Sequence, residues 1–182
     1  ARFLLSKSGG LLHYDWGMSP SNRPTIHLMV GLPYSGKSTY IRNHPTLSTL
    51  SVVDSDSYIE KKAKAENTSY GAIFDREIEA ALKYRDWLTQ KLIRQQRSFI
   101  VDQTNLTRMA RAHWIELAQK HHYRIVAHVF ALPSDESQLL ARRQRRVDKV
   151  IPIAVLAEMI SAYEMPSPDE GFSEILWIDG YV

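Results

Sequence analysis

The sequence contains no cysteine, no long run of apolar residues and no excess of glycine or proline. The absence of cysteine excludes a disulfide scaffold, a Cys-ligated zinc site and a thiol nucleophile. It also suits a reducing compartment, so we expect a cytoplasmic protein, or a nuclear one in a eukaryote. The longest uncharged apolar stretches are shorter than the ~18 residues that a membrane-spanning helix needs, and no membrane partner is expected.

What is present is the composition of an ordinary globular domain. Of 182 residues, 44% are hydrophobic and 24% are charged, which excludes disordered, collagen-like and coiled-coil chains. The formal net charge of +3 favours an anionic partner only weakly, because three surplus charges make a weak field. The seven histidines show no metal-ligand spacing, so no zinc site is predicted.

The first 23 residues differ in character from the rest. They mix short apolar pairs with Gly, Ser and Pro and have no sustained periodicity. Lys7 and two following glycines interrupt the apolar run too early for a signal peptide. We interpret residues 1–23 as a tail, an interdomain segment or an expression remnant, with Met18 beginning the domain's own segment. The domain itself is expected at 24–182.

From Pro24 onward, strand-like and helix-like patterns alternate. Short apolar runs predict strands at 25–30, 50–54, 98–102, 124–132 and 175–179. Three- and four-residue periodicity predicts helices at 36–43, 55–66, 69–97, 108–121, 134–147 and 152–164. The length of the helix at 69–97 suggests a break near 70–71. This alternation predicts an α/β fold, a parallel sheet with helices on both faces.

The strongest motif is G-L-P-Y-S-G-K-S at 31–38, a complete G-x-x-x-x-G-K-[ST] phosphate loop between a predicted strand and a predicted helix. Such a loop turns backbone N–H groups toward an anion at the start of a helix. Lys37 is expected to reach the β- and γ-phosphates, and the Ser38 hydroxyl to bind Mg²⁺. The predicted nucleotide-binding residues are Gly31, Pro33, Ser35, Gly36, Lys37, Ser38 and Thr39. The motif predicts a nucleoside-triphosphate site.

Tyr34 is an unusual residue for this loop. If its position needs a positive φ, tyrosine costs on the order of 1 kcal/mol there. Alternatively, its ring covers the nucleotide or the acceptor.

Two predicted strand ends carry carboxylates, and ligands gather beyond such ends in open α/β sheets. Asp102 follows an apolar strand in the manner of a Walker B acid, which predicts a role in the Mg²⁺ shell. Asp54 and Asp56 follow another strand. Asp56 is expected to accept the proton of an acceptor hydroxyl, as in phosphoryl transfer to alcohols. Helix capping is the alternative for either residue.

A cluster of arginines follows the fourth predicted strand. Arg142 and Arg146 are four residues apart and share one helical face. At this place in the chain, a mobile lid would deliver guanidinium groups to the transferring phosphoryl group. The alternative is a solvated helix face. No aromatic residues are interleaved with these arginines, so base stacking is not indicated there.

Taken together, these motifs resemble the polynucleotide 5′-hydroxyl kinases, a group of P-loop kinases found in phage and animal end-healing enzymes. The resemblance spans about residues 25–179 and rests on the phosphate loop, D-S-D-S-Y at 54–58, V-D-Q-T-N-L at 101–106, A-R-R-Q-R-R at 141–146, I-P at 151–152, E-M-P at 164–166 and E-G-F-S-E-I at 170–175. It implies a P-loop kinase fold, with a five-stranded parallel sheet and a helical lid. It also implies ATP and Mg²⁺ as cofactors and a DNA or RNA 5′ end as partner.

The resemblance also implies roles for single residues. By position, Asp56 matches the general base, Lys37 and Ser38 the phosphate-binding lysine and the Mg²⁺ ligand, and Arg142 and Arg146 the lid arginines. The residues implied beside the acceptor are Thr104, Asn105 and Arg108.

Two departures leave the acceptor open. Ile59 stands where the phage enzyme has an arginine that grips the acceptor phosphate, and Gln103 rather than an acid precedes Thr104. A small-molecule or nucleotide-sugar kinase similar to zeta toxins is therefore an alternative. A non-catalytic nucleotide-binding module similar to the domain of heterogeneous nuclear ribonucleoprotein U is another. The sequence does not decide between DNA and RNA, between ATP and GTP, or among oligomeric states.

Overall fold

The computed structural model describes residues 23–132, 136–144 and 151–178. Predictions for residues 1–22, for both ends of the helix at 134–147, for Arg146 and for Asp179 lie outside these ranges. The described elements are β1 (Thr25–Val30), α1 (Lys37–Asn43), the 3₁₀ helix η2 (Leu47–Thr49), β2 (Ser51–Val53), α2 (Asp56–Ala65), α3 (Tyr70–Arg94), β3 (Phe99–Val101), α4 (Arg108–Lys120), β4 (Arg124–Phe130), α5 (Glu136–Gln144), α6 (Ile153–Ser161), the 3₁₀ helix η3 (Pro168–Glu170) and β5 (Glu174–Ile178).

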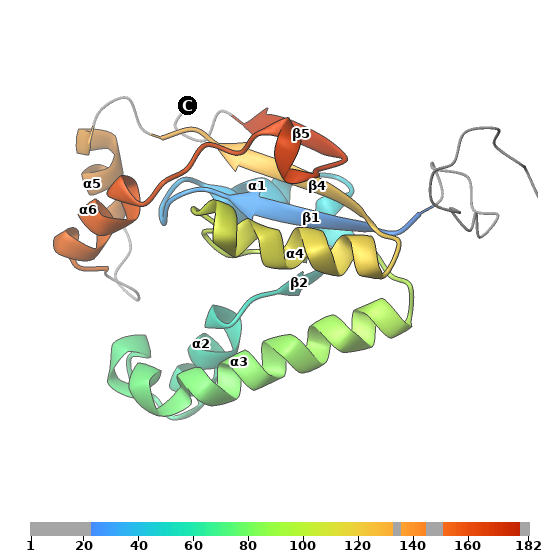
Figure 1. Ribbon diagram of the computed structural model, residues 1–182. Coiled ribbons are helices and arrows are strands. Elements are labelled where there is room, and N and C mark those ends of the chain that lie inside the picture. Colours follow the sequence, from blue (N-terminus) through green and yellow to red (C-terminus); the bar gives the residue numbers. More distant parts are fainter. Residues whose placement is uncertain (1–22, 133–135, 145–150, 179–182) are drawn as a thin grey trace, which may run out of the picture.

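The strands form one sheet in the order β2-β3-β1-β4-β5 (Figure 1), and every pairing is parallel. The predicted α/β fold is confirmed. In the centre, Leu28 of β1 lies opposite Val101 of β3 and Ala127 of β4. The carboxyl ends of neighbouring parallel strands meet at one edge of the sheet. The segments that follow β1, β2 and β3 are therefore brought together there.

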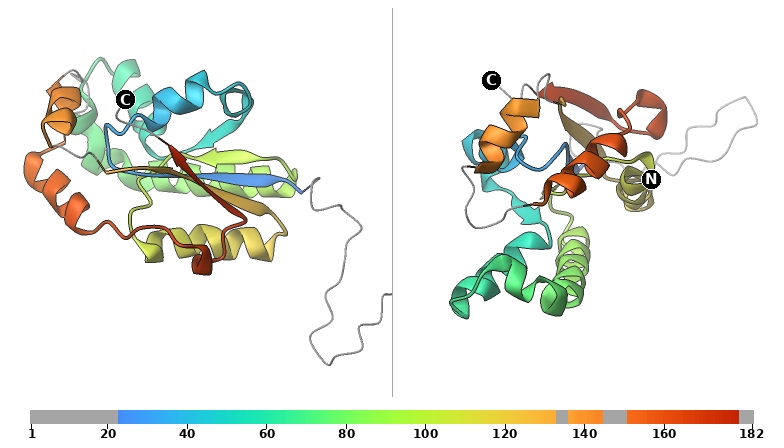
Figure 2. Two further views of the ribbon diagram at one scale, coloured as in Figure 1. Left: turned by 90° about the horizontal axis from the view of Figure 1, so that it is seen from above. Right: turned by 90° about the vertical axis from the view of Figure 1, so that its left-hand side faces the viewer.

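The two faces of the sheet are covered by different helices, because alternate strand residues point to opposite sides. Ile26, Leu28 and Val30 belong to the larger core, which includes residues of α3 and α4. Met29 belongs to a second core, with Ile41 of α1. In Figures 1 and 2, α1 and α4 accordingly lie on opposite faces of the sheet. All of β3 and six of the seven residues of β4 are buried, which explains their continuous apolar runs.

Helix α3 is a single helix of 25 residues, so the predicted break near 70–71 is wrong. The helix begins at Tyr70, and the side chain of Ser69 caps it by accepting a hydrogen bond from the N–H of Ala72. Gly71 therefore lies in the first turn, where it marks a helix start rather than an interruption. Glycine is costly mainly in helix interiors.

Helices α2 and α3 pack against each other around a small apolar cluster of their own, formed by Ile59, Ala63, Ile73 and Ala81. In Figure 1 and in the right-hand view of Figure 2, this pair projects from one side of the sheet. Only the C-terminal end of α3, at Leu92 and Ile93, reaches the larger core.

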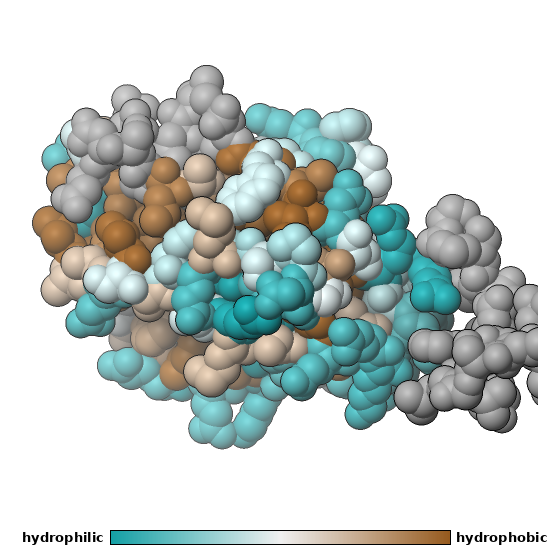
Figure 3. Space-filling model, turned by 45° about the horizontal axis from the view of Figure 1, so that its top comes forward, coloured by the Kyte–Doolittle hydropathy of each residue, from teal (hydrophilic) through white to brown (hydrophobic). Residues whose placement is uncertain are grey.

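Helices α5 and α6 lie together at one end of the molecule, on the left in Figure 1. Leu139 of α5 and Leu156 of α6 share a third cluster with Leu32 of the phosphate loop. The space-filling view shows apolar side chains gathered at this end (Figure 3), and Ile153 there is 59% exposed. None of the described helices combines the length and the apolar character that crossing a membrane requires.

Candidate functional site

The phosphate loop, residues 31–38, connects the end of β1 to the start of α1. A Cβ atom on Gly31 would lie 2.8 Å from the Cβ of Phe130, a contact too close for any other residue type. The Gly31 N–H donates to the carbonyl oxygen of Thr104 at 2.9 Å. Gly36 precedes α1 with φ 99°, in the left-handed region that favours glycine. The two glycines of the motif thus permit the tight passage from strand to helix.

The interior of the loop is cationic and rich in hydroxyl groups. The Nζ of Lys37 donates to the carbonyl oxygens of Gly31 at 2.9 Å and Leu32 at 2.7 Å, and the residue is only 9% exposed. Ser35 is fully buried, and its Oγ has no hydrogen-bond partner among the described residues. Such an orphan hydroxyl is costly, and an anion bound in the loop would accept a hydrogen bond from it. The residues present therefore fit a phosphate group.

At the start of α1, the predicted Mg²⁺ ligands lie next to each other. The Ser38 hydroxyl donates to Oδ2 of Asp102 at 3.0 Å. Asp102 follows β3, the strand beside β1, which explains this contact across 64 residues of sequence. Of the other predicted loop residues, Pro33 is half-buried, and the exposed Thr39 accepts a hydrogen bond from Arg42 at 3.2 Å.

The surroundings of the Asp102 carboxyl group act on its pKa in both directions. Burial raises its pKa, and the charges of Asp54 and Asp56 raise it further, whereas Lys37 and the Ser38 hydrogen bond lower it. A divalent cation at this position would favour the ionised carboxylate.

The donor set fits Mg²⁺ held jointly with a nucleotide. The described residues contain no group of three or more His, Asp or Glu side chains able to hold a metal by themselves. Mg²⁺ usually keeps several waters and takes one or two carboxylates plus substrate phosphate oxygens. The hydroxyl of Ser38 and the carboxylate of Asp102, beside a phosphate loop, match that pattern.

The two acids after β2 have different contacts. Asp54 accepts a hydrogen bond from the N–H of Ser57 at 2.5 Å, which caps the first turn of α2. Asp56, the first residue of α2, accepts a hydrogen bond from the hydroxyl of Tyr70 at 2.7 Å. Burial and the neighbouring Asp56 raise the pKa of Tyr70, so its hydroxyl stays protonated and donates. The capping alternative thus describes Asp54, while α3 orients the carboxylate of Asp56. No sequence pattern predicts the hydrogen bond from Tyr70 to Asp56.

The segment after β3 is tied to the phosphate loop through its backbone. The carbonyl of Thr104 accepts the hydrogen bond from Gly31. Asn105 has φ 48° and is only 4% exposed, and its side-chain N–H donates to the carbonyl of Met29 at 2.8 Å. Asn105 thereby joins the ends of β1 and β3. That Thr104 and Asn105 contact an acceptor stays a prediction.

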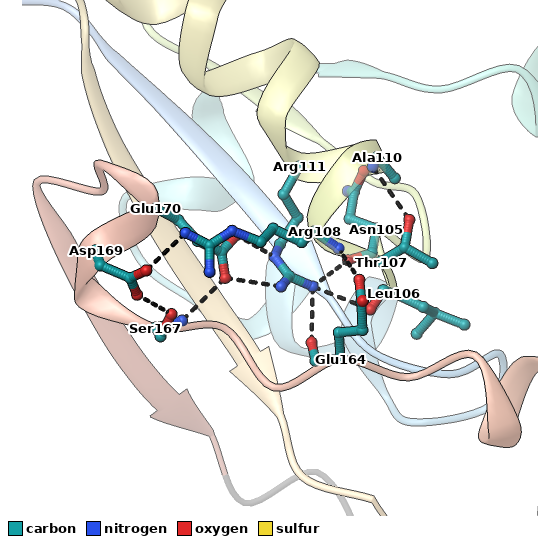
Figure 4. A network of polar contacts seen from close by, with 10 residues as sticks. All are labelled: Asn105, Leu106, Thr107, Arg108, Ala110, Arg111, Glu164, Ser167, Asp169 and Glu170. Atoms are coloured by element: carbon teal, nitrogen blue, oxygen red, sulfur yellow. Dashed lines mark hydrogen bonds and ion pairs between the residues drawn. The ribbon is translucent and has the colours of Figure 1, made fainter.

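A buried ion pair that the sequence analysis missed anchors this segment (Figure 4). The guanidinium of Arg111 bonds both carboxylate oxygens of Glu170 at 2.8 Å, and their side chains are 0% and 2% exposed. Its Nη1 also donates to the carbonyls of Asn105, Leu106 and Glu164, at 3.2, 3.0 and 2.8 Å.

A signal for the pair exists on α4. Arg111 belongs to its buried stripe, together with Trp114, Ile115 and Ala118, and an arginine in an apolar stripe needs a buried partner. The neighbouring Arg108, predicted to contact the acceptor, has a side chain that is 54% exposed and forms an ion pair with Asp169 at 2.6 Å.

Tyr34 connects the phosphate loop to α5 and to the residues just before α6. Its φ is 65°, so the residue does adopt the left-handed conformation. Its hydroxyl accepts a hydrogen bond from the N–H of Ile151 at 2.9 Å, and its carbonyl accepts one from Arg142 at 3.4 Å. Arg143 donates in turn to the carbonyl of Ile151 at 2.7 Å. Arg142 therefore contacts the phosphate loop, and its role as a lid arginine stays a prediction.

One edge of the sheet thus gathers a buried lysine, a hydroxyl–carboxylate pair, an oriented second carboxylate and an arginine. These are Lys37, Ser38 with Asp102, Asp56 and Arg142. This set is suited to binding phosphates and to removing a proton from a nearby hydroxyl.

Comparison with known proteins agrees with this geometry. The family model for an AAA domain matches residues 26–166. No curated protein shows significant sequence similarity to this chain. The fold is similar to the structure of the PezAT chromosomal toxin–antitoxin system of Streptococcus pneumoniae, with TM-score 0.64, 16% identity, and 91% of this chain and 71% of that chain covered.

Two further structures share the fold. For the AvrRxo1-ORF1:AvrRxo1-ORF2 complex with ATP, the TM-score is 0.63 at 18% identity, with 77% of this chain and 47% of that chain covered. This chain thus spans about half of that one. For a sugar kinase from Janibacter sp. HTCC2649, the TM-score is 0.55 at 15% identity, with 87% and 86% covered. At these identities, the likeness establishes the fold.

Proposed function

The chain belongs to this AAA domain family and has a kinase-like P-loop fold, and from that premise we propose that it is an ATP- and Mg²⁺-dependent kinase acting on the 5′-hydroxyl of DNA or RNA. The observation that carries the proposal is the carboxylate of Asp56. It is held by Tyr70 at the edge of the sheet where Lys37 and the Ser38–Asp102 pair lie.

In the proposed reaction, the acceptor oxygen forms a bond to the γ-phosphorus while the bond between the γ-phosphorus and the β–γ bridging oxygen breaks and ADP leaves. Asp56 accepts the proton of the acceptor hydroxyl. Lys37 and Arg142 stabilise the negative charge on the transferring group. Ser38 and Asp102 would hold Mg²⁺, which neutralises charge on the β- and γ-phosphates.

The choice of a 5′-hydroxyl acceptor is supported by the motifs that resemble the polynucleotide kinases. Among them, the structure shows contacts for E-G-F-S-E-I at 170–175, whose Glu170 holds Arg111 and, through it, the segment after β3. This part of the resemblance concerns how the site is built rather than which acceptor it takes.

A small-molecule acceptor is the second candidate, and Ile59 favours it. This residue occupies the register of the arginine that grips the acceptor phosphate in the phage enzyme, yet it is fully buried in the α2–α3 cluster. An acceptor phosphate therefore has no partner at that position. A non-catalytic nucleotide-binding module is less well supported, because Lys37, Asp56 and Asp102 are all present.

The test is incubation of the protein with [γ-³²P]ATP, Mg²⁺ and oligonucleotides that carry either a 5′-hydroxyl or a 5′-phosphate. We expect label on the 5′-hydroxyl strands only. Lys37→Ala and Asp56→Asn should each slow transfer about 100-fold or more. Asp75→Asn, which removes an exposed carboxylate of α3, is the matched control and should not change the rate.

The outcomes separate the candidates. Transfer to a sugar or nucleoside but not to an oligonucleotide would establish that the acceptor is a small molecule. ATP binding without transfer to any alcohol would establish a binding module. A large loss of ATP affinity in Asp56→Asn would reassign that carboxylate to the Mg²⁺ shell.

A further inference from the structure

The α2–α3 pair carries a row of three aromatic side chains that the proposed chemistry does not use. The ring of Tyr58 on α2 lies 5.5 Å from that of Tyr84 on α3, and Tyr84 lies 5.7 Å from Trp87 (centroid to centroid). The planes of each pair are inclined by 36° and 31°. The aromatic row, as we call these three residues, is therefore a continuous and roughly aligned set of rings.

Two of the three rings of the aromatic row are open to solvent, while Tyr58 is partly buried against the apolar cluster of α2 and α3. Tyr84 is 37% exposed and Trp87 is 51% exposed. Large aromatic side chains are otherwise the usual residues of cores, and a contiguous exposed group of them marks an interaction site. The row is thus available to a partner.

Lysines accompany the row along its length. The Nζ of Lys62 lies 5.9 Å from the centre of the Tyr58 ring, and the Nζ of Lys91 lies 5.0 Å from that of Trp87. Lys62 is neutralised by Glu77 at 2.6 Å. The ion pairs of the described residues include neither Lys61 nor Lys91, so these two contribute the positive charge.

A hollow of about 360 Å³ opens between the two helices at one end of the row. It is lined by Tyr58, Lys61, Lys62 and Tyr84. It is an open hollow on the surface rather than an enclosed pocket. Aromatic walls with ammonium groups at the rim suit a flat, anionic ligand such as one nucleotide.

The row begins close to the proposed catalytic carboxylate. Asp56 and Tyr58 are the first and third residues of α2, about 3 Å apart along the helix axis and about 200° apart around it. Asp56 contacts Tyr70 of α3, and Tyr58 contacts Tyr84 of α3. A strand whose 5′ end reaches Asp56 would pass around the start of α2 to bring its following nucleotides to the row.

We propose that the aromatic row, with Lys61 and Lys91, binds single-stranded nucleic acid by stacking its bases and pairing its phosphates. Exposed aromatic rings with nearby cations are the general means of binding single strands without sequence preference. As the path of the acceptor strand, this surface deepens the proposed function and rests on it. As a binding surface, it is measurable without any catalysis.

The test measures binding and transfer separately. In the absence of ATP, a 3′-fluorescein dT₁₂ strand is titrated with protein and followed by fluorescence anisotropy. Trp87→Ala and Tyr84→Ala should each weaken binding about 10-fold or more. Trp177→Ala is the matched control, because Trp177 on β5 is similarly exposed at 55%. Lys61→Ala/Lys91→Ala should reduce the slope of log K against log salt by up to about 0.7 for each lost phosphate contact.

In the transfer assay, Trp87→Ala should raise KM for a 12-nucleotide acceptor about 10-fold and leave KM for a nucleoside 3′-monophosphate unchanged, since a single nucleotide with its 5′-hydroxyl at Asp56 does not extend to Trp87.

The proposal is overturned if Trp87→Ala binds dT₁₂ as tightly as the wild type does. It is also overturned if sedimentation shows that Trp87→Ala abolishes a dimer without affecting DNA binding, because the occupant is then a second copy. Loss of DNA binding in a protein that transfers no phosphate would support the surface while refuting the kinase. Wild-type DNA binding by the variant, with full 5′-hydroxyl transfer, would refute the surface alone.

Discussion

Replacing Arg111 by methionine should destabilise the protein strongly. The guanidinium makes five hydrogen bonds, two to Glu170 and three to backbone carbonyls of two separate segments. Methionine fills much of the same volume and donates none of these bonds. Glu170 would remain as a carboxylate with a side chain only 2% exposed and without its ion-pair partner.

The magnitude follows from that unpaired charge. Removing one member of a buried ion pair costs about 3–5 kcal/mol, a large part of the ~5–15 kcal/mol that stabilises a typical domain. With a urea m-value of about 1–3 kcal/mol per M, the unfolding midpoint should fall by more than about 1 M. Urea unfolding followed by tryptophan fluorescence measures this.

The control is Arg108→Met on the same helix. Arg108 is 54% exposed and pairs with the exposed Asp169, so its loss should leave the urea midpoint nearly unchanged. The double variant Arg111→Met/Glu170→Leu should recover part of the lost stability, because no buried charge remains. Equal midpoints for Arg111→Met and Arg108→Met would refute this reasoning.

Three further predictions concern other parts of the molecule. Nδ1 of His27 lies 3.0 Å from Nε2 of His128, and burial lowers the pKa of both side chains from 6.5 to about 4. As the pH falls, the unfolded chain therefore takes up protons at these residues before the folded protein does. Their contribution to stability is complete above pH 6.5 and is lost as the pH falls toward 4. In His128→Gln, the midpoint of urea unfolding should therefore depend less on pH between 6.5 and 4. An unchanged pH dependence would contradict this. Tyr34→Phe removes the acceptor of the hydrogen bond from the Ile151 N–H. Hydrogen exchange followed by mass spectrometry should then be faster in α5 and α6 and unchanged in β1 and β4. Unchanged exchange in α5 and α6 would show that this bond does not hold the two helices against the phosphate loop. Asp102→Asn should abolish most of the Mg²⁺-dependent gain in ATP affinity in calorimetry and leave binding without Mg²⁺ nearly unchanged, and an intact gain would place the metal elsewhere.

The local features of this protein are determined by its sequence alone. The phosphate loop was identifiable because its function needs fixed residue types at fixed spacing, with glycine at both 31 and 36. Each strand was found within a few residues, and β3 and β4 were clearest because buried parallel strands are continuous apolar runs. The predicted break near 70–71 was wrong because a glycine in the first turn of a helix and a glycine in a helix interior have the same local sequence pattern.

The tertiary structure decided which distant residues meet. Arg111 and Glu170 are 59 residues apart, and only the packing of α4 against η3 joins them. Asp54 and Asp56 follow the same strand, and the approach of Tyr70 from α3 shows that Asp56 is held by a second helix while Asp54 caps its own. The aromatic row arises in the same way, because antiparallel packing of α2 on α3 places Tyr58 beside Tyr84. The spacing of motif residues and the hydrophobic period are local properties that can be read from a sequence. Contacts between distant elements depend instead on the order in which the chain passes through the sheet.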